Sequence, residues 1–288
     1  MLTVYHSNMF TPQAGRAWRA PVVLEIFALG NLSFLGVDIL LAHAINAFHH
    51  PAEWIPLFVS VLATLLLPPV LLMYFKTDRM VWRRTACFGG LAFAFIAIVT
   101  GMSGMWFHLE SRFFQQGTLH SLVYTAPFIA PLAYTGVGFL LLLNRMVTDN
   151  STLWARWVVF LALAGFAGNF ALSLADHAQN GFFHVSEWIP VVGSAFALTF
   201  LVWPVLLPAP NRLLMGMVAL IVLAQMVIGV YGAVLHITAN FAEPGGFPDN
   251  FIYGAPVFAP LLFANLAILT LIGLDRMHVI YFEQTQVK

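Results

Sequence analysis

Eight runs of apolar residues divide the chain, and their length limits the folds that it can adopt. They cover residues 21–44, 54–75, 85–107, 121–143, 154–175, 188–207, 213–235 and 251–274. Each run is close to the ~20 residues that an α-helix needs to cross the hydrocarbon core of a bilayer. A segment inside lipid must satisfy its backbone hydrogen bonds within a helix or a closed barrel. The sequence therefore predicts an all-α polytopic membrane protein with eight transmembrane helices.

Charged residues are too few for a water-soluble protein. They make up 8% of the 288 residues, and hydrophobic residues make up 60%, whereas soluble domains average about 25% charged residues. The formal net charge is zero and the chain has no basic tract, which argues against a nucleic-acid partner. We expect the lipid bilayer to be the main surrounding of this chain.

One segment occurs twice. HAINAFHHPAEWIP begins at His43, and HAQNGFFHVSEWIP begins at His177, 134 residues later. A second similarity joins FHL around His108 to LHI around His236, and YTAPFIAPL to YGAPVFAPL later in each half. These matches predict two tandem four-helix repeats, at residues 21–143 and 154–274. Because four spans is an even number, both repeats should enter the membrane in the same orientation.

Lysine and arginine lie almost entirely on one side of the predicted spans. Eleven of the 12 basic residues fall there, and Arg112 alone lies on the opposite side. The eleven are Arg16, Arg19, Lys76, Arg79, Arg83, Arg84, Arg145, Arg156, Arg212, Arg276 and Lys288. Basic segments remain in the cytoplasm, so we expect cytoplasmic segments at 1–20, 144–153 and 275–288. The expected location is a bacterial inner membrane, with most histidines on the periplasmic face.

The duplicated segments contain residue types that bind transition metals. In a bundle of four antiparallel helices, the outer ends of spans one and three lie beside the outer starts of spans two and four. The sequence therefore predicts two ligand sets, which are His43, His50, Glu53 and His108 in the first repeat and His177, His184, Glu187 and His236 in the second. Imidazoles with a carboxylate suit copper, non-haem iron or zinc, and not magnesium or calcium.

Five further residues near these positions are expected to orient the ligands as second-shell partners. They are His120, Asp176, Asp249, Tyr124 and Tyr253. Cys87 is the only cysteine, which excludes an intramolecular disulfide and covalent haem c attachment.

An interpretation without metal also explains the duplicated segment. Pro51 suits the first position of a helix, and a glutamate in the first turn caps backbone N–H groups. Trp54 and Trp188 would then anchor the helices at the membrane interface.

Two other features concern polar groups within the spans. Glu25 and Asp38 are acids inside the first span, and either a functional or a structural hydrogen-bonding role is open to them. The AP-x-x-AP-L segments place Pro127 and Pro131, then Pro256 and Pro260, four residues apart. These prolines should kink their helices and leave backbone carbonyls without a donor.

Three functions agree with these patterns. The first is a membrane metalloprotein, an oxidoreductase or a redox subunit, which could act with other membrane subunits or a periplasmic redox partner. The second is a b-type cytochrome in which His43 with His108, and His177 with His236, each bind one haem b. The third is a metal-ion transporter or delivery protein.

Overall fold

The computed structural model describes residues 19–77 and 79–283, and every regular element in these ranges is helical. The main helices are α2 (Arg19–Ala44), α3 (Trp54–Lys76), α4 (Met80–Glu110), α7 (Leu132–Met146), α8 (Thr152–Gln179), α9 (Trp188–Leu206), α10 (Arg212–Ala242) and α12 (Leu261–His278). Short elements are α5 (Phe113–Gln116), α6 (Leu119–Val123), α11 (Phe247–Tyr253), the 3₁₀ turns Pro51–Glu53 and Val185–Glu187, and the π-turn Val279–Glu283. The expected all-α fold is confirmed.

Seven helices in the described part of the chain are long and apolar enough to cross a membrane. They are α2, α3, α4, α8, α9, α10 and α12. This number of apolar helices is typical of an integral membrane protein in contact with a lipid bilayer. The eighth long element, α7, is apolar but has only 15 residues.

The prolines explain the shortness of α7. We expected one kinked helix over 121–143 and another over 251–274, and this was wrong. The chain instead leaves the helical conformation after α6 and after α11, and it resumes only at Leu132 and Leu261, directly after Pro131 and Pro260. Each pair of prolines removes two backbone N–H donors four residues apart and clashes with the preceding turn, and at these two places the helix is interrupted, whereas α3 continues through Pro68 and Pro69.

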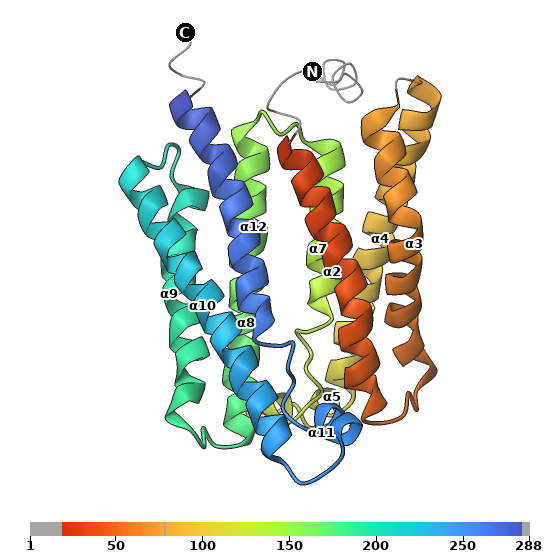
Figure 1. Cartoon of the computed structure of the whole chain (residues 1–288), viewed down its shortest axis with the longest axis vertical. Helices are drawn as coiled ribbons and strands as arrows, with labels where there is room; N and C mark the ends of the chain where they lie inside the picture. Colours follow the sequence, from red (N-terminus) through yellow and green to blue (C-terminus); the bar gives the residue numbers. More distant parts are fainter. Residues whose placement is uncertain (1–18, 78, 284–288) are drawn as a thin grey trace.

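The long helices lie side by side along the long dimension of the molecule (Figure 1). Helices α2, α3, α4 and α7 lie in one half of the view, and α8, α9, α10 and α12 lie in the other. Helix α7 contacts α8, and α2 contacts α12, where the halves meet. The short helices α5 and α11 lie at one end, with the links that follow α2 and α8. We call this the histidine end, because it carries His43, His108, His177 and His236.

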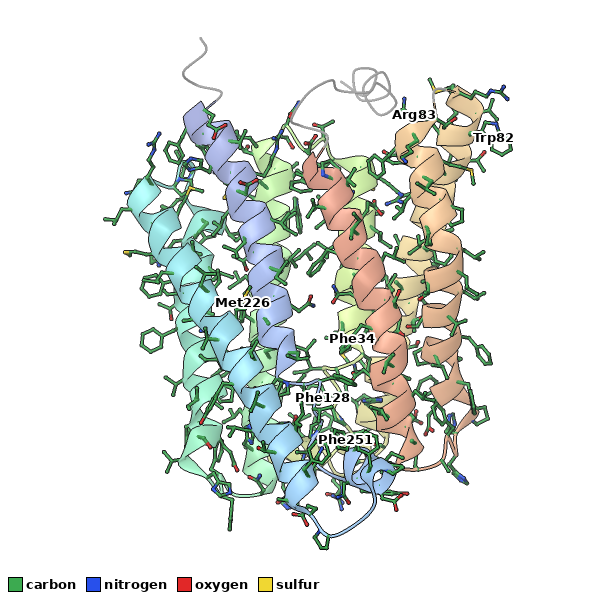
Figure 2. All side chains as sticks on the ribbon, viewed as in Figure 1. Phe34, Trp82, Arg83, Phe128, Met226 and Phe251 are labelled. Carbon is green, nitrogen blue, oxygen red and sulfur yellow. The ribbon has the colours of Figure 1, made fainter. Side chains whose placement is uncertain are left out.

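The opposite end, which we call the basic end, carries the links α3–α4, α7–α8 and α9–α10 and the end of α12 (Figure 1). Its described basic residues are Arg19, Lys76, Arg79, Arg83, Arg84, Arg145, Arg156, Arg212 and Arg276. Figure 2 shows Arg83 at this end. Arg112 alone among the described lysines and arginines lies at the histidine end. Arg16 and Lys288 lie outside the described residues.

Glycines let two pairs of helices pack closely. A Cβ atom on Gly101 of α4 would lie 2.7 Å from the carbonyl oxygen of Pro131, and one on Gly229 of α10 would lie 2.8 Å from that of Pro260. Only a residue without a side chain permits such an approach. As a result, α4 packs tightly against the start of α7, and α10 against the start of α12.

A buried ion pair lies toward the basic end. The guanidinium of Arg145 pairs with the carboxylate of Glu25, and both side chains are at most 1% exposed. Asn144 donates to Oε1 of Glu25 at 2.9 Å and accepts from Nε1 of Trp154 at 3.3 Å. Glu25 therefore has a structural partner, and the network connects α2, α7 and α8.

A second ion pair connects the α7–α8 link to α12. Arg276 donates from Nε to the carbonyl oxygen of Asp149 at 2.7 Å, and its Nη2 lies 3.4 Å from Oδ2 of the same residue. Burial raises the pKa of the Asp149 carboxyl, and the nearby charge of Arg276 partly opposes this shift.

Candidate functional site

The first histidine of each duplicated segment faces a carboxylate from the same segment. Nδ1 of His43 lies 3.5 Å from Oε2 of Glu53, and Nδ1 of His177 lies 3.6 Å from Oε2 of Glu187. Each histidine is in the last turn of a long helix, and each glutamate comes directly before the next long helix. The link between the two helices must therefore reverse direction to bring these side chains together.

The reversal uses a left-handed backbone in both links. Ala47 and Phe48 have φ angles of 57° and 54°, and Gly181 and Phe182 have φ angles of 73° and 53°. The N–H of each phenylalanine donates to the carbonyl oxygen of the preceding histidine, at 3.1 Å for Phe48 and 2.9 Å for Phe182. This closes the turn in the same way at both places.

Each phenylalanine ring then packs on the tryptophan that begins the next helix. The ring centres of Phe48 and Trp54 are 4.4 Å apart, and those of Phe182 and Trp188 are 4.0 Å apart. Both tryptophans remain more than 40% exposed, as interfacial anchors do. The aromatic pair covers the turn beside the histidine.

The second histidine of each set is held by a backbone carbonyl from the proline segment. Nδ1 of His108 lies 2.8 Å from the carbonyl oxygen of Pro127, and Nδ1 of His236 lies 2.8 Å from that of Pro256. A carbonyl oxygen can only accept, so Nδ1 must carry the proton in both rings. In the neutral imidazole, Nε2 then has the free lone pair.

The structure brings the two histidines of the first set near each other. The ring centres of His43 and His108 are 6.2 Å apart, with ring planes inclined at 57°. These two rings and those of His177 and His236 are half-buried.

One oxygen of each carboxylate is buried and accepts no hydrogen bond among the described residues. These are Oε2 of Glu53 and Oε2 of Glu187, the same atoms that face His43 and His177. The other oxygens are occupied, since Oε1 of Glu53 accepts from Asn46 at 2.8 Å and Oε1 of Glu187 accepts from the backbone N–H of His184 at 3.2 Å. Each site thus keeps one acceptor for an imidazole N–H or a cation.

His50 and His184 lie at helix starts outside these pairs. Nδ1 of His50 accepts from the backbone N–H of Ala52 at 3.2 Å and caps the 3₁₀ turn that begins at Pro51. His184 occupies the corresponding cap position in the second half. Both residues are exposed. Their positions match the capping interpretation of the motif.

The residues expected to orient the ligands are more dispersed. His120 stacks on Tyr124 with ring centres 4.6 Å apart, and both residues are exposed. Asp249 and Tyr253 are exposed on α11, and Asp176 is half-buried next to His177 on α8. Within residues 19–77 and 79–283, no three His, Cys, Asp or Glu side chains are gathered closely enough to hold a metal ion by themselves.

Sequence reasoning missed the acceptors that orient the second histidines. The AP-x-x-AP-L segments predicted backbone carbonyls without a helical donor. Nothing in them indicated that the carbonyl oxygens of Pro127 and Pro256 would accept from His108 and His236. Asn46, which holds Glu53, was also missed, although it lies in the duplicated segment.

The chain matches no protein-family model, no curated protein and no solved structure.

Proposed function

We propose that this chain is an integral membrane metalloprotein with two transition-metal sites, one on each histidine pair. The ligands are Nε2 of His43 and His108 in one site and Nε2 of His177 and His236 in the other. The observation that supports this proposal is the Nδ1 arrangement: in both sets, one ring faces a glutamate and the other a proline carbonyl. An oxygen partner on the second ring nitrogen is the usual surrounding of a metal-bound histidine, because it sets the tautomer and the ring orientation.

The spacing of the first pair agrees with one ion between two rings. A metal bonded to both Nε2 atoms at about 2 Å would place the ring centres at most roughly 6 to 7 Å apart. The observed 6.2 Å between His43 and His108 is near this limit and favours rings on opposite sides of the metal. The remaining ligands would come from water, substrate or a cofactor.

Oε2 of Glu53 and Oε2 of Glu187 face the Nδ1 edge of His43 and His177, so they support a metal on Nε2 through the imidazole and not as its ligands. A buried carboxylate oxygen without a donor costs about 1–3 kcal/mol, and the Nδ1–H of an imidazole that binds metal through Nε2 would offset this cost. Imidazole and carboxylate together suit copper, non-haem iron or zinc. We propose a redox subunit or oxidoreductase as the functional class, because two of these metals change oxidation state.

A b-type cytochrome is the second candidate. It agrees with the 6.2 Å between the ring centres of His43 and His108, because haem iron takes four nitrogens from the porphyrin and needs only two axial imidazoles. His177 and His236 would bind a second haem in the same way.

Metal content and an absorption spectrum test these proposals together. The purified protein, loaded separately with copper, iron, zinc or haem, should bind two equivalents of one of them, and a Soret band would identify haem. His108→Ala and His236→Ala should each remove one equivalent, whereas the exposed His120→Ala should remove none. A wild-type protein that binds none of these groups, or variants that keep both equivalents, would disprove the metal sites.

We further propose eight membrane passes in two tandem repeats, at residues 21–143 and 154–274, in a bacterial inner membrane. Both termini and the basic end then lie in the cytoplasm. The segregation of basic residues supports this orientation. With Cys87 replaced by Ala, a cysteine at Gln116 should react with an impermeant thiol reagent from the periplasm, and one at Ala209 should not. The reverse pattern would invert the orientation.

A further inference from the structure

An apolar cavity of about 520 Å³ lies between α2, α10, α11 and the start of α12. Leu41 comes from α2, Ala233 and Ile237 from α10, and Phe247 and Phe251 from α11. Figure 2 shows Phe251 at the histidine end. The cavity reaches the surface, because Phe247 is 66% and Ile237 is 37% exposed.

The chemistry of the cavity wall limits what can occupy it. All ten residues that line it are apolar, so a water or a polar headgroup inside would find no hydrogen-bond partner among these side chains. An apolar pocket instead gains free energy when it removes hydrocarbon from contact with water. At the end of a membrane-spanning bundle, the available hydrocarbon is the chain of a lipid or of a lipid-soluble compound.

Two of the residues that line this space are smaller than their counterparts in the first half. The segments GMSGMWFH, which ends at His108, and GVYGAVLH, which ends at His236, align Met105 with Ala233. The proline segments likewise align Phe128 with Val257. Ala233 and Val257 both line the cavity, and each is smaller than its counterpart. Figure 2 shows that the side chain of Phe128 lies at the histidine end, between the two halves of the view.

The cavity also adjoins the second histidine pair along the chain. Ile237 directly follows His236, and Val257 directly follows Pro256, whose carbonyl oxygen accepts from that histidine. Helix α2 contributes Leu41, two residues before His43. A chain in the cavity would therefore lie beside the histidine end of both halves.

We propose that this cavity is a binding site for one hydrocarbon chain, the acyl or prenyl tail of a lipid-phase ligand. The site belongs to the second half, because Ala233 and Val257 replace the larger side chains of the first. Its occupancy depends on shape and on apolar contact, and it does not require metal at the histidines.

Photo-crosslinking of a fatty acid tests this site. The purified full-length protein in detergent is illuminated with palmitic acid that carries a diazirine in its chain, and the labelled peptides are located by mass spectrometry. We expect label on α10, α11 and the residues near Val257, and we expect excess unlabelled palmitic acid to compete for it.

Ala233→Met fills the cavity with the side chain that the first half has at the aligned position. It should lower labelling of these peptides at least fivefold, and Ala233→Met with Val257→Phe should abolish it. Val230→Phe, on an exposed part of the same helix, is the matched control and should label as the wild type does. Competition with a prenyl alcohol, compared with palmitic acid, distinguishes prenyl from acyl tails.

Label spread evenly over the apolar surface of the wild type would overturn the proposal, as would cavity labelling that Ala233→Met leaves unchanged. If a variant does not fold, the labelling pattern of the wild type and its competition by unlabelled palmitic acid still test whether the cavity binds the chain. Metal loading of the same samples is a separate readout, so failure of the metal proposal and failure of this one are distinguishable.

Discussion

Ala47 and Gly181 occupy equivalent positions in the two links, and both have a left-handed backbone. Glycine suits this conformation, and alanine does not. Both residues have a positive φ, 57° at Ala47 and 73° at Gly181. A residue with a Cβ atom pays roughly 1–2 kcal/mol for this conformation, and glycine does not. The first link therefore carries a backbone cost that the second avoids.

Ala47→Gly should raise the free energy of unfolding by about 1 kcal/mol, because it removes this cost. Gly181→Ala should lower it by a similar amount, although a Cβ atom there would contact nothing within 4 Å. Thermal unfolding in detergent should show the two shifts, each roughly 2 °C, in opposite directions.

Gly30→Ala is the control for this pair of variants, because Gly30 is helical and its added Cβ atom would also contact nothing within 4 Å. It should not destabilise the protein. Equal effects of Gly30→Ala and Gly181→Ala would contradict a role for the left-handed turn.

Glycines bring α4 close to α7 and α10 close to α12. A Cβ atom on Gly104 would lie 2.8 Å from Cβ of Pro131, and one on Gly232 would lie 2.8 Å from Cβ of Pro260. Each contact lies near the point where α7 or α12 resumes after the proline segment. The same proline segments carry the carbonyl oxygens of Pro127 and Pro256, which lie 2.8 Å from Nδ1 of His108 and His236.

Gly229→Ala should destabilise the protein by about 1–3 kcal/mol, because the added methyl group would meet the carbonyl oxygen of Pro260 and the backbone of α12 must move. Gly216→Ala on the same helix, where a Cβ atom meets nothing within 4 Å, should leave stability unchanged or slightly higher. Unfolding temperatures of the two variants in one detergent provide the measurement. If Gly229→Ala lowers the unfolding temperature no more than Gly216→Ala does, close α10–α12 packing is not a source of stability.

Polar contacts join the two halves of the molecule, in addition to the apolar core that they share. Asn31 of α2 and Asn265 of α12 donate to each other, at 3.2 Å and 2.5 Å. The Glu25–Arg145 pair joins α2 to α7, and Asn144 extends it to Trp154 of α8. Gly90 leaves room for this arginine, since a Cβ atom there would fall 1.8 Å from its Nε.

Glu25→Leu should cost about 3–5 kcal/mol of stability, because it leaves the Arg145 charge buried without its partner. The double variant Glu25→Leu with Arg145→Met should recover most of this loss, since it removes both charges. Denaturation by sodium dodecyl sulfate, followed by circular dichroism, measures the three proteins. If the double variant is no more stable than the single one, the ion pair is not the source of the effect.

The local pattern of the sequence was enough to predict several properties of this protein. Hydropathy acts over stretches of about 20 residues, and so it identified helical, membrane-spanning segments. The duplicated segment indicated that His43 and His177, and Glu53 and Glu187, have equivalent places, and the structure pairs them alike. The spacing of the prolines indicated carbonyls without helical donors.

Tertiary structure alone decided which groups meet. Arg145 was assigned to a loop on its charge, yet it lies buried against Glu25, because a charge pattern does not reveal a partner 120 residues away. Pro127 meets His108 across the contact between α4 and the segment that precedes α7, and His50 caps the 3₁₀ turn that follows the reversal of the link. The cavity beside Ala233 depends on the packing of four segments. Hydropathy and helix propensity act through near neighbours in the chain, whereas these contacts depend on how distant helices pack.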